Sequence, residues 1–409
     1  MRWLAELAPD IRQYMIVTGN YWAFTLTDGA LRMLVVLHFH GLGYSPLAIA
    51  MLFIFYEIFG VITNLVGGWL GARLGLNKTM NVGLFLQIVA LVMLLVPASF
   101  LTVAWVMAAQ ALSGIAKDLN KMSAKSAIKL LVPSDAQGQL YRWVAILTGS
   151  KNALKGAGFF LGGALLTWLG FAGAVLAMAT MLAAVWVLSL IGLGKDLGRA
   201  KSKPKFTDIF SKSRAINYLS AARMFLFGAR DVWFVVALPV YLASTFNWDH
   251  WWVGGFLALW IIGYGFIQGL APKITNRGAL PGGQQALAWA GMLSIVPALI
   301  ALALTYQWHP AASLLFGLMV FGAFFAINSS LHSYLIVSYA GEDGVSLDVG
   351  FYYMANAMGR LIGTVLSGWL YQDYGLVACL WVSAGFIAMA AFISLGLPKR
   401  QAQPAEYSG

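Results

Sequence analysis

Charge and cysteine are scarce in this chain of 409 residues. Only 10% of the residues are charged, and Cys379 is the single cysteine. One cysteine excludes an internal disulfide and any metal site built from several cysteines. The sequence also has no Walker loop, no Ser-His-Asp arrangement and no cluster of metal ligands, so it gives no support for ATP drive or for hydrolysis in the membrane. We therefore expect no catalytic residue, metal or cofactor.

Acidic residues are scarcer than basic ones, with 15 Asp and Glu against 26 Lys and Arg. The rest of the chain is apolar, with 60% hydrophobic residues and a mean hydropathy of +0.76. Apolar runs of roughly 20 residues recur from end to end, which is the length that crosses a bilayer as a helix. The composition indicates an all-α polytopic membrane protein whose partners are the lipid bilayer and a small molecule, with no nucleic acid.

The apolar runs, divided at their Gly, Pro and charged residues, predict twelve spans. They cover approximately residues 14 to 38, 46 to 70, 78 to 97, 103 to 131, 141 to 167, 172 to 194, 216 to 243, 251 to 271, 284 to 305, 311 to 338, 347 to 370 and 375 to 397. Residues 1 to 13 are too charged for the core of a cleaved signal, so we expect the first run to be a genuine span. Lys and Arg occupy alternate loops, above all residues 195 to 214, which places both termini in the cytoplasm.

An internal repeat relates the two halves of the chain. Residues 155 to 170 superimpose on residues 360 to 375 at an offset of 205. The match pairs Lys155 with Arg360, Gly158 with Gly363, Gly163 with Gly368, and Gly170 with Gly375. We expect the glycines to let helices approach closely. The predicted organisation is a six-helix bundle over 1–195, a basic cytoplasmic linker over 196–215 and a second six-helix bundle over 216–409.

Two six-helix halves in the same orientation resemble the parallel-repeat architecture of the major facilitator superfamily. Residues 67 to 78 are also similar to a loop signature of that superfamily, matched here by Gly68, Leu70, Arg73 and Gly75. Ala72 stands where the signature usually has Asp, so the acid of that motif is missing. The resemblance implies a transporter and leaves the substrate open.

Four lysines, Lys117, Lys121, Lys125 and Lys129, form a ladder on the fourth predicted span. Their four-residue spacing places them along one helix face over roughly 18 Å. An uncompensated ammonium group in a bilayer costs at least about 2.5 to 3.5 kcal/mol. We therefore expect an anionic substrate to compensate the ladder, whereas Lys129 reaches the interface and serves no substrate.

Other charged residues also fall within predicted spans. The predicted substrate cations are Arg32, Lys117, Lys121, Lys125, Lys151, Lys155, Arg223, Arg230 and Arg360, and the candidate proton carriers are Asp28, Glu57, Asp118 and Asp231. The lysines would hold one end of a polyanion, and Arg223, Arg230 and Arg360 the other. Lys117, Lys155, Arg230 and Arg360 lie near mid-span, which predicts a midplane site reached through a funnel of positive charge.

Partners within the membrane can also be predicted. Adjacent side chains on a helix diverge by about 100°, so Arg230 and Asp231 should pair poorly, and Asp28 is a plausible partner for Arg230. No acid on its own span is within reach of Arg360, and the first half has too few acids to pair with the lysines. His332 could bind substrate oxygens, although an interhelical hydrogen bond is the favoured interpretation.

A closer resemblance covers essentially the whole chain. Residues 19 to 40, 113 to 133 (SGIAKDLNKMSAKSAIKLLVP) and 148 to 163 are similar to the organoarsenical efflux permeases known as ArsJ, a branch of the same superfamily. This resemblance implies residence in a bacterial inner membrane and export of 1-arseno-3-phosphoglycerate, which glyceraldehyde-3-phosphate dehydrogenase makes from arsenate. Outside the cell this ester breaks down to arsenate and 3-phosphoglycerate, so its export would confer arsenate resistance.

Three alternatives remain open. An organophosphate antiporter of the same fold would use similar cations and exchange its substrate against phosphate. A phospholipid flippase or a membrane-embedded enzyme would accept a long acyl tail, but the sequence offers it no catalytic constellation. A proton-driven exporter of cationic drugs would need an excess of acids. Proton antiport and uniport driven by the membrane potential also remain open.

Overall fold

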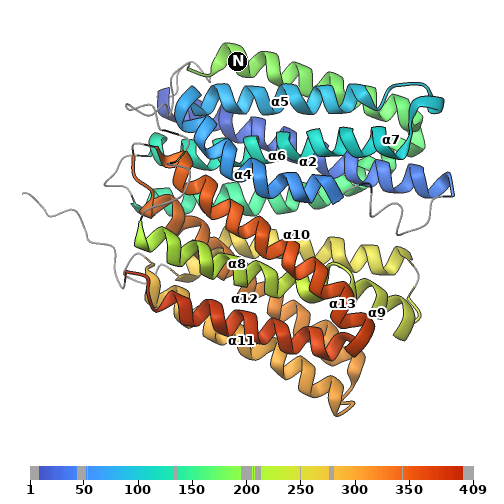
Figure 1. The fold of residues 1–409 in the computed structure, drawn as a ribbon, viewed down its shortest axis with the longest axis vertical. Coiled ribbons are helices and arrows are strands. Elements are labelled where there is room, and N and C mark those ends of the chain that lie inside the picture. The colour runs from blue at the N-terminus through green and yellow to red at the C-terminus, as the bar shows by residue number, and fades with distance from the viewer. Residues whose placement is uncertain are drawn as a thin grey trace, which may run out of the picture. The chain divides into compact units, whose positions relative to one another are not determined.

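The computed structural model describes residues 9–43, 52, 54–132, 137–194, 205, 207, 213–248, 250–275, 281–342 and 344–398. Within these ranges the regular structure is helical, as the predicted all-α class requires (Figure 1). The helices are α2 (Pro9–Gly41), α4 (Ile54–Leu74), α5 (Leu76–Met93), α6 (Val103–Leu131), α7 (Gln137–Gly192), α8 (Arg214–Phe234), α9 (Ala237–Thr245), α10 (His250–Thr275), α11 (Gly283–Thr305), α12 (Pro310–Tyr339) and α13 (Val345–Ser394). A 3₁₀ turn, η1 (Ala98–Phe100), precedes α6.

Every predicted span has a helical counterpart. In the described part of the chain, seven helices are long and apolar enough to cross a membrane, and two of these, α7 and α13, are long enough for two spans each. The seventh predicted span is broken into α8 and α9, where Pro239 cannot donate a backbone hydrogen bond. The Ser367 hydroxyl accepts the backbone N–H groups of Val236 and Ala237 at 3.3 and 3.1 Å, which caps the start of α9.

Two compact units divide the helices. Unit 1 comprises Met1–Pro133, Ser150–Phe210 and Ala340–Met354, and unit 2 comprises Ser134–Gly149, Ser211–Tyr339 and Ala355–Gly409. The units share most residues with the predicted bundles, except that the start of α7 falls in unit 2 and the start of α13 in unit 1. In unit 1 the Ser346 hydroxyl donates to the Gly68 carbonyl at 2.7 Å, and in unit 2 the hydroxyls of Tyr141 and Thr275 are 2.8 Å apart. Most of the predicted linker lies outside the described residues.

Two glycines of the internal repeat bend the long helices in the same way. Gly170 interrupts α7 with φ 68° and ψ −178°, and Gly375 interrupts α13 with φ 76° and ψ −177°. Glycine adopts a positive φ without the penalty that a Cβ imposes. The pairing of Gly170 with Gly375, predicted from sequence, therefore corresponds to one shared backbone conformation between consecutive spans.

Another repeat pair sits where two helices nearly touch. A Cβ placed on Gly158 would lie 2.7 Å from the carbonyl oxygen of Leu26 in α2. A Cβ placed on Gly363 would lie 2.6 Å from the carbonyl oxygen of Gly228 in α8. Each glycine therefore allows close backbone approach, as predicted, and brings α7 against α2 in unit 1 and α13 against α8 in unit 2.

The substitution Gly363→Ala should destabilise the protein, because the new methyl group overlaps the backbone of α8. Overpacking of this kind costs about 1 to 3 kcal/mol. The matched control is Gly368→Ala on the same helix, where a Cβ meets no atom within 4 Å. Melting of the detergent-solubilised protein should show a lower transition temperature for Gly363→Ala alone. Equal transition temperatures for the two variants would contradict the close approach.

Candidate functional site

The lysine ladder lies on α6, as predicted. The Thr102 hydroxyl caps this helix by accepting the backbone N–H of Trp105 at 3.3 Å. Lys121 and Lys125 are buried, whereas Lys117 and Lys129 are partly buried. Helix α6 packs against α2, α4 and α5, so the ladder belongs to the interior of unit 1.

One carboxylate of α6 forms ion pairs with two lysines of the ladder. The Lys121 ammonium lies 2.5 Å from Asp118 Oδ1, and the Lys117 ammonium lies 3.8 Å from Asp118 Oδ2. The Asp118 side chain is only 1% exposed. Two lysines therefore share one carboxylate, which does not contradict the expectation that the first half has fewer acids than lysines. The three side chains together carry a net charge of +1.

Two tyrosines that the sequence analysis missed complete the surroundings of the ladder. Lys117 sits 3.7 Å above the ring of Tyr56, and Lys121 and Lys125 lie 4.6 and 5.5 Å from the ring of Tyr353. Aromatic faces attract cations more strongly where water is excluded. Neither tyrosine belongs to a motif or a periodic pattern, so no signal in the sequence indicated this role.

Tyr56 also connects the ladder to the acids of neighbouring helices. Its hydroxyl donates to the Asp28 carboxylate at 2.8 and 3.1 Å. Arg32 lies 4.8 Å from the same ring and forms a 3.3 Å ion pair with Glu57. The structure therefore brings Asp28, Arg32, Glu57, Lys117 and Asp118 around one tyrosine.

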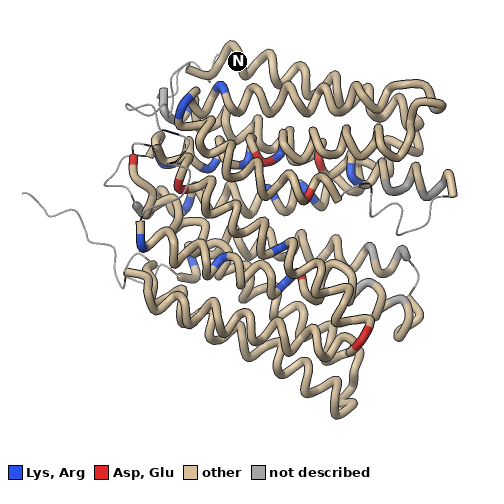
Figure 2. Tube along the Cα trace, viewed as in Figure 1, with Lys and Arg blue, Asp and Glu red and all other residues tan. Residues whose placement is uncertain are grey.

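Unit 1 retains a positive excess after its acids are counted. The six predicted substrate cations on α2, α6 and α7 outnumber the three candidate proton carriers of the unit, Asp28, Glu57 and Asp118, by three. Figure 2 shows Lys and Arg along helices that are otherwise almost uncharged. Lys155 lies on the turn of α7 that packs against Gly29, and its ammonium is 6.0 Å from the Phe159 ring. Lys151 is one turn earlier and partly buried.

Unit 2 repeats the arrangement of one carboxylate between two cations. Asp231 is fully buried and accepts Arg230 Nη2 at 2.5 Å and Arg360 Nε at 3.1 Å. One prediction is corrected here. Adjacent Arg230 and Asp231 do pair, because the long guanidinium side chain curls back to its neighbour. The prediction for Arg360 concerned acids on its own span alone, and its partner Asp231 lies on α8, against which α13 packs closely.

The predicted pair of Arg230 with Asp28 would join residues of different units. Within its own unit, Asp28 accepts the hydroxyl of Tyr56, and Arg230 binds Asp231. Arg230 is also surrounded by the rings of Phe227, Phe234 and Phe325 at 5.0 to 5.8 Å. Neither charged group therefore requires the other as its partner.

Arg223 is buried among neutral hydrogen-bonding groups of unit 2. It donates to Asn356 Oδ1 at 2.9 Å, to the Ser329 hydroxyl at 3.2 Å and to the Ser329 carbonyl at 3.3 Å. The Gln268 amide donates to the same hydroxyl at 3.0 Å, and the guanidinium lies 3.8 Å from the Phe227 ring. Unit 2 has three predicted substrate cations and one candidate proton carrier, Asp231. The cations therefore exceed it by two positive charges.

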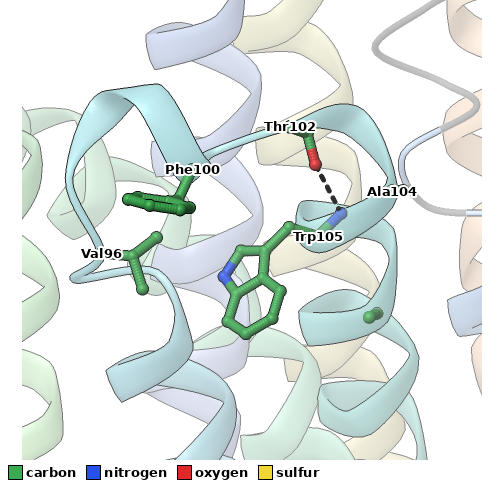
Figure 3. A pocket seen from close by; sticks show the side chains of 6 residues that line it. Val96, Phe100, Thr102, Ala104 and Trp105 are labelled. Carbon is green, nitrogen blue, oxygen red and sulfur yellow. Dashed lines mark hydrogen bonds between the residues drawn. The ribbon is translucent and has the colours of Figure 1, made fainter.

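A hollow of about 420 Å³ lies at the start of α6, away from these charges. It is lined by Val96, Phe100, Thr102, Ala104, Trp105 and Ala108. The rings of Phe100 and Trp105 border it in Figure 3, and none of its lining side chains is charged. This apolar hollow cannot compensate a polyanion and is not the predicted site.

Long apolar helices with buried cations in each unit define a multi-pass membrane transporter. The chain belongs to the Major Facilitator Superfamily, which matches residues 16–345. A comparison with curated proteins finds no match.

Among solved structures, the human organic anion transporter MFSD10 (TETRAN) is similar with a TM-score of 0.75 and 17% identity, covering 95% of this chain and 100% of that one. FucP in the outward conformation also has a TM-score of 0.75, with 12% identity and coverage of 95% and 99%. A bacterial homologue of the iron transporter ferroportin in the outward-facing state has a TM-score of 0.73, with 14% identity and the same coverage. At these identities the likeness establishes the fold alone.

The shared carboxylate of unit 2 predicts how arginine variants behave. Arg360→Ala should leave abundance unchanged, because Arg230 still neutralises Asp231. The double variant Arg230→Ala, Arg360→Ala should lose most of its abundance, because it strands a buried carboxylate at a cost of roughly 3 to 5 kcal/mol. Adding Asp231→Asn should restore abundance.

Membrane abundance would be measured by fluorescence of a fused reporter after size exclusion. If the double variant is as abundant as wild type, or if Asp231→Asn fails to restore it, the shared ion pair does not stabilise unit 2.

Proposed function

We propose that this chain is a secondary active efflux transporter for a small polyanionic ester. Its most specific candidate substrate is 1-arseno-3-phosphoglycerate, whose export would confer arsenate resistance. The observation that carries the proposal is the positive excess of three charges in unit 1 and two in unit 2 among the predicted membrane cations and acids. Buried charge of one sign is costly unless a ligand of opposite sign compensates it.

The charge of the substrate fits this excess. An ester with a phosphate at one end and an arsenate at the other carries about three negative charges, and oxyanions form strong charge-assisted hydrogen bonds with Lys and Arg. Unit 1 presents lysines, which are compact and adaptable point charges. Unit 2 presents arginines, whose planar fork binds two oxygens at once. Each cluster has the charge to bind one anionic end.

The membrane potential supplies energy for export. With an inside-negative potential of about 100 mV, moving about three negative charges outward releases roughly 7 kcal/mol. A uniporter of this substrate would already concentrate it outside. Export therefore does not require proton antiport.

Two further observations favour an organic anion with an arsenate group. MFSD10, a structural neighbour, is an organic anion transporter, so this fold carries such substrates in another protein. The resemblance of residues 113 to 133 to ArsJ permeases selects the arsenical ester among organic anions. The proposal places the chain in a bacterial inner membrane with both termini cytoplasmic, and links it functionally to glyceraldehyde-3-phosphate dehydrogenase.

An organophosphate antiporter is the second candidate, since the same cations would bind a phosphate ester. Exchange of a glycolytic ester against inorganic phosphate in vesicles would favour it. The flippase alternative has less support, because its lipid substrate would need a cationic site that opens sideways to the bilayer. An enzymatic role is not part of the proposal.

Arsenate tolerance in a sensitive bacterium tests the substrate. Tolerance should appear only when this chain and glyceraldehyde-3-phosphate dehydrogenase are expressed together, because the enzyme makes the exported ester. Tolerance to arsenite should not change, since arsenite does not form the ester. Growth at increasing arsenate and arsenite concentrations is the measurement. Arsenite tolerance conferred by the chain alone would overturn the assignment.

Replacing individual membrane lysines should reduce transport to different degrees. Lys117→Ala and Lys155→Ala should each reduce transport at least about tenfold at normal abundance, since each removes a cation that attracts the substrate. Lys121 still neutralises Asp118 in Lys117→Ala, so no carboxylate is stranded. Lys129→Ala on the same helix is the matched control and should transport nearly normally. Uptake into everted vesicles is the readout, and equally small effects at all three positions would show that the ladder is structural.

A further inference from the structure

Helix α12 carries a buried polar stretch with unsatisfied groups. Ser329 and His332 are each 1% exposed and Ser333 is fully buried. Within the described part of the chain, the two ring nitrogens of His332 have no hydrogen-bond partner, and the Ser333 hydroxyl has none either. The interhelical partner that sequence analysis favoured for His332 is thus not among the described residues. A buried histidine without partners is costly, and such groups call for a ligand, a water or a catalytic role as explanation.

The contacts between α8 and α12 place His332 beside Arg223. Arg223 binds Ser329, and four residues further along α8, Phe227 packs on Phe325 at 5.1 Å, so the two helices run antiparallel along this line. His332 follows Ser329 by three residues and lies on the same helix face. It is also within electrostatic range of Arg223.

The antiparallel alignment of α8 with α12 extends for one more turn beyond Arg223. Three residues before Arg223 is Ser220, which the antiparallel register brings to the level of His332. Ser220 is 2% exposed, and its hydroxyl is also without a partner among the described residues. Arg223 therefore borders a polar region between α8 and α12 in which His332, Ser333 and Ser220 have no hydrogen-bond partner among the described residues.

The internal repeat makes this stretch of α12 the counterpart of the lysine ladder on α6. The offset of 205 between residues 155–170 and 360–375 makes α12, the fourth span of the second half, the counterpart of α6. It maps residues 117–129 of the ladder onto residues 322–334. The stretch that contains Ser329, His332 and Ser333 thus occupies the position that cationic residues occupy on α6.

We propose that His332 is a protonatable ligand for an oxyanion of the substrate, and that binding in unit 2 takes up one proton on its imidazole. This inference rests on the proposed function and adds to it a specific residue and a charge. A protonated imidazole donates from both ring nitrogens, which would satisfy the two groups that now have no partner. Arg223 would contribute the second cation to the same oxyanion.

The charges around His332 explain why its imidazole would take up a proton only when the substrate binds. From α8 it faces Arg223, with the Arg230–Asp231 pair two turns further along. From α10, Gln268 binds the Ser329 hydroxyl and Tyr264 lies 5.7 Å from the Phe325 ring, and Tyr141 from α7 lies 4.7 Å from the Tyr334 ring at a tilt. The described helix α11 has no titratable side chain. A second cation beside Arg223 is therefore disfavoured until an anion binds between them.

The acids predicted as proton carriers are less suited to this task. Asp118 and Asp231 are each shared by two cations, and protonation of either would leave both cations without their counter-charge. Asp28 already accepts the hydroxyl of Tyr56, and Glu57 forms an ion pair with Arg32 at 3.3 Å. A proton carried on His332 would travel with the substrate and reduce the charge moved per cycle from about three to about two.

Calorimetry of 3-phosphoglycerate binding to the full-length protein in detergent tests the inference. Titrations near neutral pH in buffers of different ionisation enthalpy give the number of protons taken up on binding. The wild type should take up about one more proton than His332→Gln, and its affinity should rise more steeply as the pH falls, by up to about tenfold per pH unit. His332→Asn serves as a second neutral variant if His332→Gln melts below wild type.

The matched control is His38→Gln, which replaces a histidine of α2 that stacks on Phe171 at 4.0 Å. This control should keep the proton uptake of wild type. Equal proton uptake in wild type and both His332 variants would overturn the inference and indicate an ordinary buried water at His332. Binding that depends on His332 in a protein that confers no arsenate tolerance would contradict only the arsenical substrate. Absence of 3-phosphoglycerate binding in the wild type would contradict both.

Discussion

The sharing of one buried carboxylate by two cations is the interaction on which both units depend. Asp118 between Lys117 and Lys121, and Asp231 between Arg230 and Arg360, lower the cost of keeping cations away from water. Each arrangement keeps one positive charge in excess of neutrality. The protein can therefore fold around these clusters without a substrate, and under the proposed function the remaining positive charge would attract an anion.

Close helix packing by glycine makes this sharing geometrically possible. Gly363 lets α13 approach α8, and the same turn of α8 carries Asp231, whose Cβ lies 2.9 Å from a Cβ built on Gly363. Arg360 reaches Asp231 because it is one turn before that contact. In unit 1 the corresponding approach of Gly158 to α2 carries Lys155 with it. The repeat thus conserves a backbone crossing while the charges placed beside it differ.

The sequence predicts spans better than it predicts contacts. Apolar length and glycine placement predicted all twelve spans and the equivalence of Gly170 with Gly375, because both follow from local chemistry. The partner of Arg230 was predicted wrongly, because a flexible guanidinium reaches an adjacent acid that helix spacing alone excludes. The partner of Arg360 was not predicted, because Asp231 lies on another helix. Tyr56 and Tyr353 were missed, since an aromatic residue in an apolar span looks the same whether it faces lipid or an ammonium group.

The contacts of the cations constrain how an anion can bind. Arg230 and Arg360 already use guanidinium groups on Asp231, and Lys121 uses its ammonium on Asp118, so an incoming oxyanion must compete with these carboxylates or add to them. Competition limits affinity, because each contact to the ligand replaces an existing ion pair. Limited affinity suits a transporter, which must release its substrate on the far side of the membrane. The acids among the cations therefore limit the affinity for an anion and do not cancel the positive charge.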